Sequence, residues 1–365
     1  MTKEKLALFR LFLTADIGII KFLRLIEFFG NASCVFNAAK EDLLSVEGIN
    51  ERIASAILNA KTLETAEKEL ELAAKHNIKI VFCQDPDYPE PLKELDDKPV
   101  FLYICGNFKK EDINSLAIVG ARNPSIYGKA VSEEFADFFA KNNVTLVSGL
   151  ARGIDTQAHL SALKHKSGTI AVLGNGLLVN YPPENAKIQA KIAENGAVIS
   201  EFPLASEPDT YTFPRRNRII AGLAKATLVI EARIKSGAMI TAKYAVNYGK
   251  DVFAVPGNIH SQLSRGTNAL ISEGAYPALS PQSMAESLSY IHIYNSVAGN
   301  TGSKGLADTE RKVLRLIENS VDGISPDALA QKTKIAISEI SGIILALEMS
   351  DLIKVLPGQI CVKKR

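Results

Sequence analysis

A short apolar run that breaks at a glycine and restarts as a helix constrains this fold most strongly. Residues 117–119 read as a buried strand, Gly120 opens a polar loop, and apolar residues recur at helical spacing after Gly128. This order of strand, glycine turn and helix opens a doubly wound sheet, whose ligands lie beyond the carboxyl ends of the strands. We therefore expect a ligand beside this loop, with Arg122 at the rim.

The alternation of strand and helix continues from about residue 115 to residue 279. Further strands are predicted at 144–148, 169–173, 197–201, 226–231 and 251–255, and helices at 154–165, 184–195, 216–224 and 238–248. Strands and helices at this spacing predict a doubly wound, mainly parallel sheet covered on both faces. Because the loops after parallel strands share one edge, their glycines and polar residues should meet in one groove.

The predicted groove has the composition of an anion site. The segment FPRRNRI at 213–219 carries three arginines at the start of a helix, where the helix dipole adds positive potential. Arg215 and Arg218 share a helix face if the helix starts early enough, so that phosphates could bridge them; alternatively, one arginine pairs internally with Glu201 or Glu231. The expected ligand contacts are Gly120, Arg122, Gly149, Arg152, Gly174, Asn175, Phe213, Arg215, Arg216, Asn217, Arg218, Ser236, Gly237, Lys243, Gly257 and Arg265.

Aromatic residues accompany the cations. Tyr127, Tyr181, Phe202 and Phe213 lie near the same loops. Exposed aromatic rings beside cations stack bases in non-specific single-strand binding, although each ring taken singly also suits a core position.

Known enzyme motifs are missing from these loops. The GARNPS loop lacks the GxGxxG pattern, and the second strand ends without the acidic residue of a dinucleotide site. Lys129 is followed by alanine, which excludes a Walker loop, and Ser148 is not in a GxSxG elbow. Asp155 and Glu201 could hold a metal, but carboxylates in such positions are usually structural. We predict no catalytic residue, no metal and no cofactor.

Composition sets wider limits. The 365-residue chain carries a formal net charge of +2, so a nucleic acid would have to be held by a local basic surface. Its four cysteines, Cys34, Cys83, Cys105 and Cys361, are too far apart in sequence for a CxxC pair and suit free thiols in a reducing cytoplasm. We find neither an export signal nor an apolar run long enough for a membrane span, and expect a cytoplasmic protein.

Two flanking domains are predicted. Residues 1–78 are helical, and within 41–60 two short helices joined through Gly48 suggest a helix-hairpin-helix or SAM-like unit. Such a hairpin can hold DNA phosphates, but Asn50 replaces its usual second glycine, and a plain helical packing module is the alternative. The sheet domain spans 79–290, beginning with short strands around a proline-rich turn, and a linker spans 291–305.

Residues 306–365 are predicted to form a winged helix. Helices are expected at 309–319, 325–333 and 337–349, followed by two short strands. The third helix carries Glu339 and Glu348 but no lysine or arginine, so phosphate should repel it and a protein contact or accessory role is favoured. Lys354 and the basic tail at 363–365 keep a weaker DNA role open.

The motifs together resemble one family. The stretches AIVGARNPSIYG, SGLARGIDTQAH, TIAVLGNGLLVNYPPEN, ISEFP, FPRRNRIIAGLA, SGAMITAKYA and VPGNIHSQLSRGTNALISEGA are similar, in order and spacing, to the DNA-processing protein A family, DprA or Smf. The resemblance implies an extended Rossmann-like domain whose loop groove binds single-stranded DNA without sequence preference, and a homodimer formed through that domain. It also implies that the protein protects this DNA and loads the RecA recombinase in natural transformation (competence) and homologous recombination. It implies DNA contacts by Arg122 and by the arginines of FPRRNR; near YPxEN, Pro183 stands where family members often have lysine.

One enzyme class offers an alternative. Nucleotide phosphoribohydrolases use a similar domain and end a late strand with proline and glycine, as Pro256 and Gly257 do here. Their motif continues PGGxGT with a catalytic glutamate, whereas this chain reads PGNIHSQ. We therefore expect a non-enzymatic mediator, in which Arg216→Glu or Arg122→Glu weakens binding to every homopolymer and leaves the fold intact.

Overall fold

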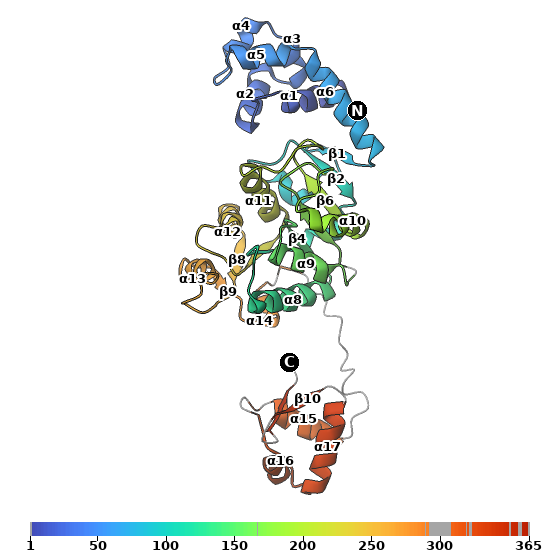
Figure 1. Ribbon diagram of the computed structural model, residues 1–365, viewed down its shortest axis with the longest axis vertical. Helices are drawn as coiled ribbons and strands as arrows, with labels where there is room; N and C mark the ends of the chain where they lie inside the picture. The colour runs from blue at the N-terminus through green and yellow to red at the C-terminus, as the bar shows by residue number, and fades with distance from the viewer. Residues whose placement is uncertain are drawn as a thin grey trace. The chain divides into compact units, whose positions relative to one another are not determined.

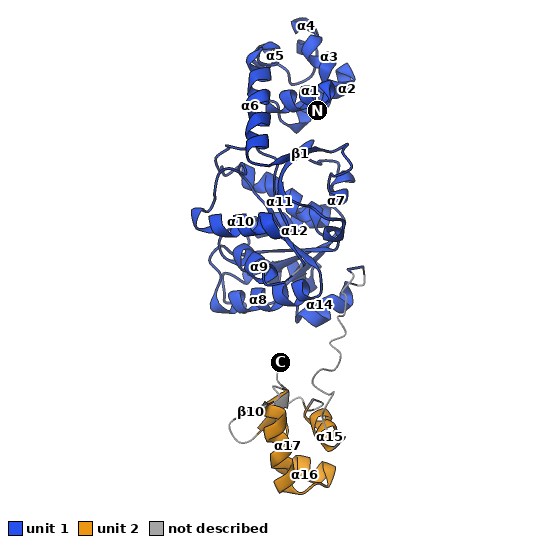
Figure 2. Ribbon diagram, turned by 90° about the vertical axis from the view of Figure 1, so that its right-hand side faces the viewer, with its two compact units in different colours: residues 1–294 blue, residues 295–365 orange. Residues whose placement is uncertain are grey.

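The computed structural model describes residues 2–165, 167–288, 290–291, 308–318, 320, 323–349, 352–356 and 360–363. The chain forms two compact units, residues 1–294 and 295–365 (Figure 2). Within the described residues, no helix combines the length and apolar character that a membrane span requires. The domain boundaries predicted at residues 78 and 290 stay predictions.

A nine-stranded sheet organises the first unit, in the order β1-β2-β6-β5-β4-β3-β7-β8-β9 (Figure 1). The strands are β1 Lys79–Phe82, β2 Phe101–Gly106, β3 Ser115–Gly120, β4 Thr145–Ser148, β5 Thr169–Val172, β6 Ala197–Ser200, β7 Ala226–Ile230, β8 Asp251–Ala254 and β9 Tyr276–Pro277. From β6 to β9 all neighbours are parallel, whereas β1 and β2 add two antiparallel pairings at one edge. The predicted doubly wound, mainly parallel sheet is confirmed.

Helices cover both faces of this sheet. They are α7 Glu90–Lys93, α8 Ile126–Lys141, α9 Ile154–Ala162, α10 Ala186–Asn195, α11 Thr212–Leu223, α12 Gly237–Asn247, α13 Arg265–Ser272 and α14 Pro281–Ser287, with 3-10 turns at Lys110–Ile113 and Pro183–Asn185. Alternate residues of β3 pack to opposite sides: Ile118 meets Phe139 of α8, and Val119 lies in the core that contains Ile220 of α11. The apolar run of β3 is buried because both of its faces are covered.

The chain reverses direction across the sheet between β3 and β7. From β3 it proceeds through β4 and β5 to β6, and then returns to add β7 on the other side of β3, where Gly120 pairs with Ile230. The loops after β3 and β7 therefore flank a topological switch point, where doubly wound sheets bind their ligands. Helix α11, which makes the return, begins at Thr212 and not at Arg216 as predicted.

Six helices precede the sheet: α1 Lys3–Leu13, α2 Ile19–Phe29, α3 Ala32–Asn37, α4 Lys40–Leu44, α5 Glu51–Leu58 and α6 Lys61–Lys75. They pack on the antiparallel edge through aromatic rings: the ring of Phe101 lies 4.9 Å from that of Phe9 and 5.0 Å from that of Phe12. Glu69 of α6 accepts a hydrogen bond of 2.9 Å from the hydroxyl of Tyr103. The predicted N-terminal helical region is confirmed.

The predicted hairpin lies between α4 and α5. Gly48 has a φ of +88°, and the Asn50 side chain caps α5 by accepting a 3.0 Å bond from the N–H of Ile53. Arg24 donates to the carbonyl of Glu47 and pairs with its carboxylate at 3.2 Å. Asn50 therefore acts as a helix cap at the place of the usual glycine. A phosphate-binding role for this hairpin stays a prediction.

The second unit is a winged helix, as predicted. It contains α15 Asp308–Glu318, α16 Pro326–Thr333 and α17 Ile337–Met349, and an antiparallel pair of β10 Ile353–Leu356 and β11 Ile360–Lys363. Val313, Leu329, Ile340 and Leu347 are buried in its core. From residue 292 onward the predicted linker lies outside the described residues, as do the predicted turn at 357–359 and the last two residues of the basic tail.

Candidate nucleic-acid interface

A pocket of about 360 Å³ lies at the switch point. It is enclosed by the loops after β3 and β7 and by the first turns of α11 and α12. Its lining includes seven of the predicted contacts, Gly120, Arg122, Phe213, Arg216, Asn217, Ser236 and Gly237, together with Asn123, Asp155, Arg233 and Thr241. Segments more than 100 residues apart in sequence thus meet at one edge of the sheet, as the predicted groove requires.

A smaller hollow continues from this pocket. It is lined by Arg122, Gly149, Ala151, Arg152, Gly174, Asn175, Tyr181, Pro182, Phe213 and Arg216. The two hollows share Arg122, Ala151, Phe213 and Arg216, and we call them together the switch-point groove. Five predicted contacts line neither hollow: Arg215, Arg218, Lys243, Gly257 and Arg265.

Phe213 stands where the two hollows meet, between two cations and a second ring. Its ring centre lies 5.3 Å from the guanidinium carbon of Arg122, 6.0 Å from that of Arg216 and 5.7 Å from the ring of Tyr181. Arg122 is exposed and, within the described part of the chain, joins no ion pair. A free guanidinium beside a partly exposed ring can hold a phosphate and a base at once.

Arg216 forms the floor of the groove. It is 4% exposed and donates to the carbonyl of Gly149 at 2.6 Å, to the carbonyl of Val172, and to the side chain of Asn217 at 3.2 Å. Burial lowers the pKa of Arg216 to about 10, and the nearby Asp155 carboxylate opposes that shift. The expectation that Arg216→Glu leaves the fold intact is therefore corrected, because the change would place an unpaired carboxylate among carbonyl oxygens.

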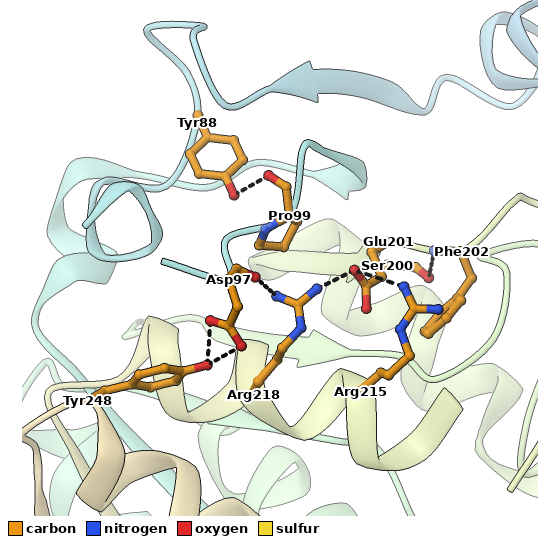
Figure 3. Close-up of polar contacts among 9 residues, drawn as sticks. All are labelled: Tyr88, Asp97, Pro99, Ser200, Glu201, Phe202, Arg215, Arg218 and Tyr248. Carbon is orange, nitrogen blue, oxygen red and sulfur yellow. Dashed lines mark hydrogen bonds and ion pairs between the residues drawn. The ribbon is translucent and has the colours of Figure 1, made fainter. Parts of the chain in front are cut away.

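Arg215 and Arg218 share the other face of α11, as the earlier start of this helix allows, but a carboxylate of the protein bridges them (Figure 3). Glu201 is 2% exposed; it contacts Arg218 directly and Arg215 at 3.7 Å. Burial raises the pKa of Glu201, and the two arginines oppose that shift.

Arg218 is buried too, with 7% of its surface exposed, and it donates to the carbonyl of Asp97 at 2.6 Å. The carboxylate of Asp97 in turn accepts a hydrogen bond from the hydroxyl of Tyr248 (Figure 3). Both terminal nitrogens of the Arg218 guanidinium thus donate to groups inside the protein, which disfavours the predicted DNA contact, and that contact stays a prediction. Arg215 keeps half of its side chain exposed and lies over the ring of Phe202 at 5.2 Å, outside the groove.

Two glycines of the groove, Gly149 and Gly174, lie against side chains of the protein itself. A Cβ atom at Gly149 would lie 2.5 Å from the Arg216 guanidinium, and one at Gly174 would lie 2.8 Å from the Phe213 ring. These glycines make room for the protein's own side chains, not for an approaching phosphate. Asn175 is 1% exposed and donates to the carbonyls of its own turn at 3.0 and 2.7 Å, which makes it structural as well.

Arg152 lines the groove but is paired. Its guanidinium makes two hydrogen bonds to the Glu184 carboxylate, one of 3.1 Å, and both side chains are about half exposed. Glu184 raises the pKa of Arg152, and Arg152 lowers that of Glu184. An anion entering the groove would compete with this carboxylate for the guanidinium.

Asp155 is a groove residue for which the sequence favoured a structural role over metal binding. This buried carboxylate accepts from the N–H groups of Gly149 and Ala151 at 3.1 and 3.4 Å, and burial raises its pKa. It fixes the loop after β4 beneath the groove. Its place in the first turn of α9 is the signal on which that expectation rested.

The fold and the groove define a doubly wound α/β protein with a cationic site at its switch point. A family model for DNA recombination-mediator protein A matches residues 79–289, and one for the DprA winged helix domain matches residues 300–359. The chain therefore belongs to the DNA recombination-mediator protein A family, DprA or Smf, and the resemblance inferred from its motifs is confirmed.

Individual relatives agree with this assignment. Protein Smf of Synechocystis is 33% identical over 377 residues, which cover 94% of this chain and 94% of the relative. The X-ray structure of DprA from Streptococcus pneumoniae is similar with a TM-score of 0.67 at 32% identity, over 78% of this chain and 98% of that one. DprA from Helicobacter pylori, described for its unique single-stranded DNA binding mode, is similar with a TM-score of 0.52 at 30% identity, over 58% and 97%.

Proposed function

We propose that this chain is a non-enzymatic mediator that binds single-stranded DNA without sequence preference in the switch-point groove. The observation that carries the proposal is the unpaired, exposed guanidinium of Arg122 lying over Phe213 at the switch point. The single-stranded DNA binding of the Helicobacter pylori relative supports it.

The groove suits sequence-independent binding for a physical reason. A guanidinium recognises phosphates, which every nucleotide carries, and a phenyl ring stacks on any base. Arg122 and Arg233 would hold the backbone while Phe213 and Tyr181 face bases, with Arg216 shaping the floor. The nucleotide-hydrolase alternative has no observation in its favour, since Gly257 of the proline-glycine pair lines neither hollow.

The wider role follows from family membership. We propose that the protein acts in the cytoplasm, protects single-stranded DNA, and loads the RecA recombinase on it during natural transformation and homologous recombination. The four free cysteines are consistent with a reducing compartment. A homodimer formed through the sheet domain is also proposed, and a monomeric mass in solution at micromolar concentration would reject it.

The test compares two cations of the same unit. Arg122→Ala removes the groove cation, whereas Lys141→Ala, the matched control, removes an exposed cation at the far end of the 16-residue α8, about 24 Å along the helix. Fluorescence anisotropy with oligo-dT would be measured over a salt series. We expect Arg122→Ala to bind about 10-fold more weakly, with a log-log salt slope smaller by about 0.7, and Lys141→Ala to bind as wild type.

The result should hold for oligonucleotides of every base, because phosphate contacts carry no sequence information. If Arg122→Ala matched the Lys141→Ala control in affinity and salt slope, the assignment of the groove would be wrong.

A further inference from the structure

We propose that Glu231 is a positioning residue that holds the Arg122 loop in its DNA-binding conformation. This inference rests on the proposed function of the groove. Glu231 follows directly after β7, so it stands across the switch point from the loop that follows β3. The residue itself would not contact DNA; it acts through the backbone that carries Arg122.

The backbone of Glu231 is in an unfavourable conformation. Its φ is +50°, in the left-handed region that glycine and asparagine favour, and the residue is 5% exposed. A large side chain remains in this region only where its surroundings fix it, and such residues gather at functional sites. The conformation turns the carboxylate toward the loop after β3.

The carboxylate there caps α8. One oxygen accepts from the backbone N–H of Ser125 at 2.8 Å, and the other accepts from the Ser125 hydroxyl. The Ser125 hydroxyl oxygen in turn accepts from the N–H of Gly128 at 3.1 Å, which is the ordinary N-cap contact. A Cβ atom at Gly128 would lie 2.2 Å from the Glu231 carboxylate, so only glycine leaves space for it.

These contacts fix one end of the loop, and other contacts fix its start. Gly120 pairs with Ile230 of β7, and the carbonyl of Ala121 accepts from the N–H of Ile154 at 3.2 Å. Arg122 is the next residue, so it lies in a short span tethered on one side by the sheet and on the other by the Glu231–Ser125 bond. Loss of that bond would release the span from one side and let the guanidinium leave its place over Phe213.

Two other roles for Glu231 are less consistent with these contacts. It takes part in none of the ion pairs found among the described residues, so it is not the internal partner of an arginine that the sequence allowed. As a negative charge beside a phosphate site it would weaken DNA binding, and its neutralisation would then strengthen binding. If Glu231 instead positions the loop, its neutralisation should weaken DNA binding, so the direction of the change in affinity distinguishes the two roles.

The test is a double-mutant cycle in the full-length chain. Glu231→Gln keeps the size of the side chain but removes its negative charge and replaces one of the two acceptor oxygens by an NH2 group, so the two charge-assisted hydrogen bonds from Ser125 are lost. With oligo-dT at low salt, we expect Glu231→Gln to bind about fivefold more weakly than wild type, and Glu231→Gln/Arg122→Ala to bind no more weakly than Arg122→Ala alone. The reason is that the loop has no guanidinium to position in the second background.

Binding by Glu231→Gln that equals or exceeds that of wild type would overturn the inference, and so would an equal loss in both backgrounds. If Glu231→Gln does not fold, Ser125→Ala, which removes one of the two donors, enters the same cycle with the same expected results. The outcome also separates this inference from the proposed function. If Arg122→Ala binds oligo-dT as tightly as wild type, the groove is not the binding site. If Arg122→Ala binds more weakly but Glu231→Gln binds as wild type, only the positioning role is rejected.

Discussion

The two faces of α11 use arginine in opposite ways. On one face Arg216 lies beneath the groove, with its guanidinium on backbone carbonyls, beside the unpaired Arg122. On the other face Arg218 and Arg215 meet the buried carboxylate of Glu201. The arginines of both faces come from the same four-residue segment, yet only the face with Arg216 lines the switch-point groove.

The difference shows that a cluster of arginines does not by itself make an anion site. A guanidinium can bind an external anion only if no carboxylate of the protein already pairs with it. Glu201 directly follows β6, the element before α11 in the chain, and its carboxylate lies against Arg215 and Arg218 of that helix (Figure 3).

Arg218→Ala should cost the most stability. The change leaves the buried Glu201 carboxylate with only the partly exposed Arg215 as partner, and breaking a buried pair costs about 3–5 kcal/mol. Denaturant unfolding followed by circular dichroism measures this loss. Arg215→Ala, on the same helix face, is the control and should cost less than about 1 kcal/mol because half of its side chain is exposed. Equal losses for the two variants would contradict the assignment of Arg218 as a structural residue.

Phe213→Leu should weaken DNA binding with little effect on folding. Leucine can still pack against Gly174 but offers no ring to a base, and base–aromatic stacking contributes about 1–3 kcal/mol per base. We expect a loss of about 10-fold in affinity for oligo-dT, measured by fluorescence anisotropy. The control is Phe202→Leu, whose ring lies beside Arg215 outside the groove. A stronger effect of Phe202→Leu would move the binding site to the other face of α11.

Glu184→Gln should strengthen binding. The change removes the carboxylate that pairs with the Arg152 guanidinium, so that a DNA phosphate no longer has to compete with this carboxylate for Arg152. Because exposed ion pairs are weak, we expect only about a two- to threefold gain, measured by anisotropy at low salt. In an Arg152→Ala background the gain should vanish. A gain that persists there would mean that Glu184 acts through its general charge.

Lys243→Ala and Arg265→Ala should have the smallest effects. Both side chains are exposed, but neither lines the switch-point groove, although the sequence placed both among the expected contacts. We expect less than about a twofold change in affinity and an unchanged salt slope. A loss as large as that of Arg122→Ala would show that the DNA path extends beyond the groove toward α12 and α13.

Much of the fold could be predicted because the local pattern and the fold agree. The apolar runs of β3, β4, β5 and β7 are buried on both faces, and strands with such surroundings are apolar throughout. The predicted start of α11, at residue 216, was wrong. The helix already includes Pro214, because proline is tolerated in the first turn of a helix. The earlier start places Arg215 and Arg218 together and turns Arg216 to the groove.

The site was predicted less completely, since its contacts depend on which distant segments meet. The glycines and arginines that follow the strands correctly indicated the edge of the sheet. However, Gly149 leaves the space that the Arg216 guanidinium occupies, and these two residues are 67 positions apart in sequence. The sequence offered Glu201 as one possible partner for an arginine of this segment, and Arg218 forms that pair. The pairing of Arg152 with Glu184 was not predicted, because no local pattern joins residues 32 positions apart. The capping role of Glu231 joins residues 106 positions apart.

A crystal structure of this protein with a short oligo-dT strand tests the central claim most directly. We expect a phosphate within hydrogen-bonding distance of the Arg122 guanidinium and a thymine base against the Phe213 ring. An ordered strand bound over Arg215 and Phe202, with the switch-point groove empty, would contradict it.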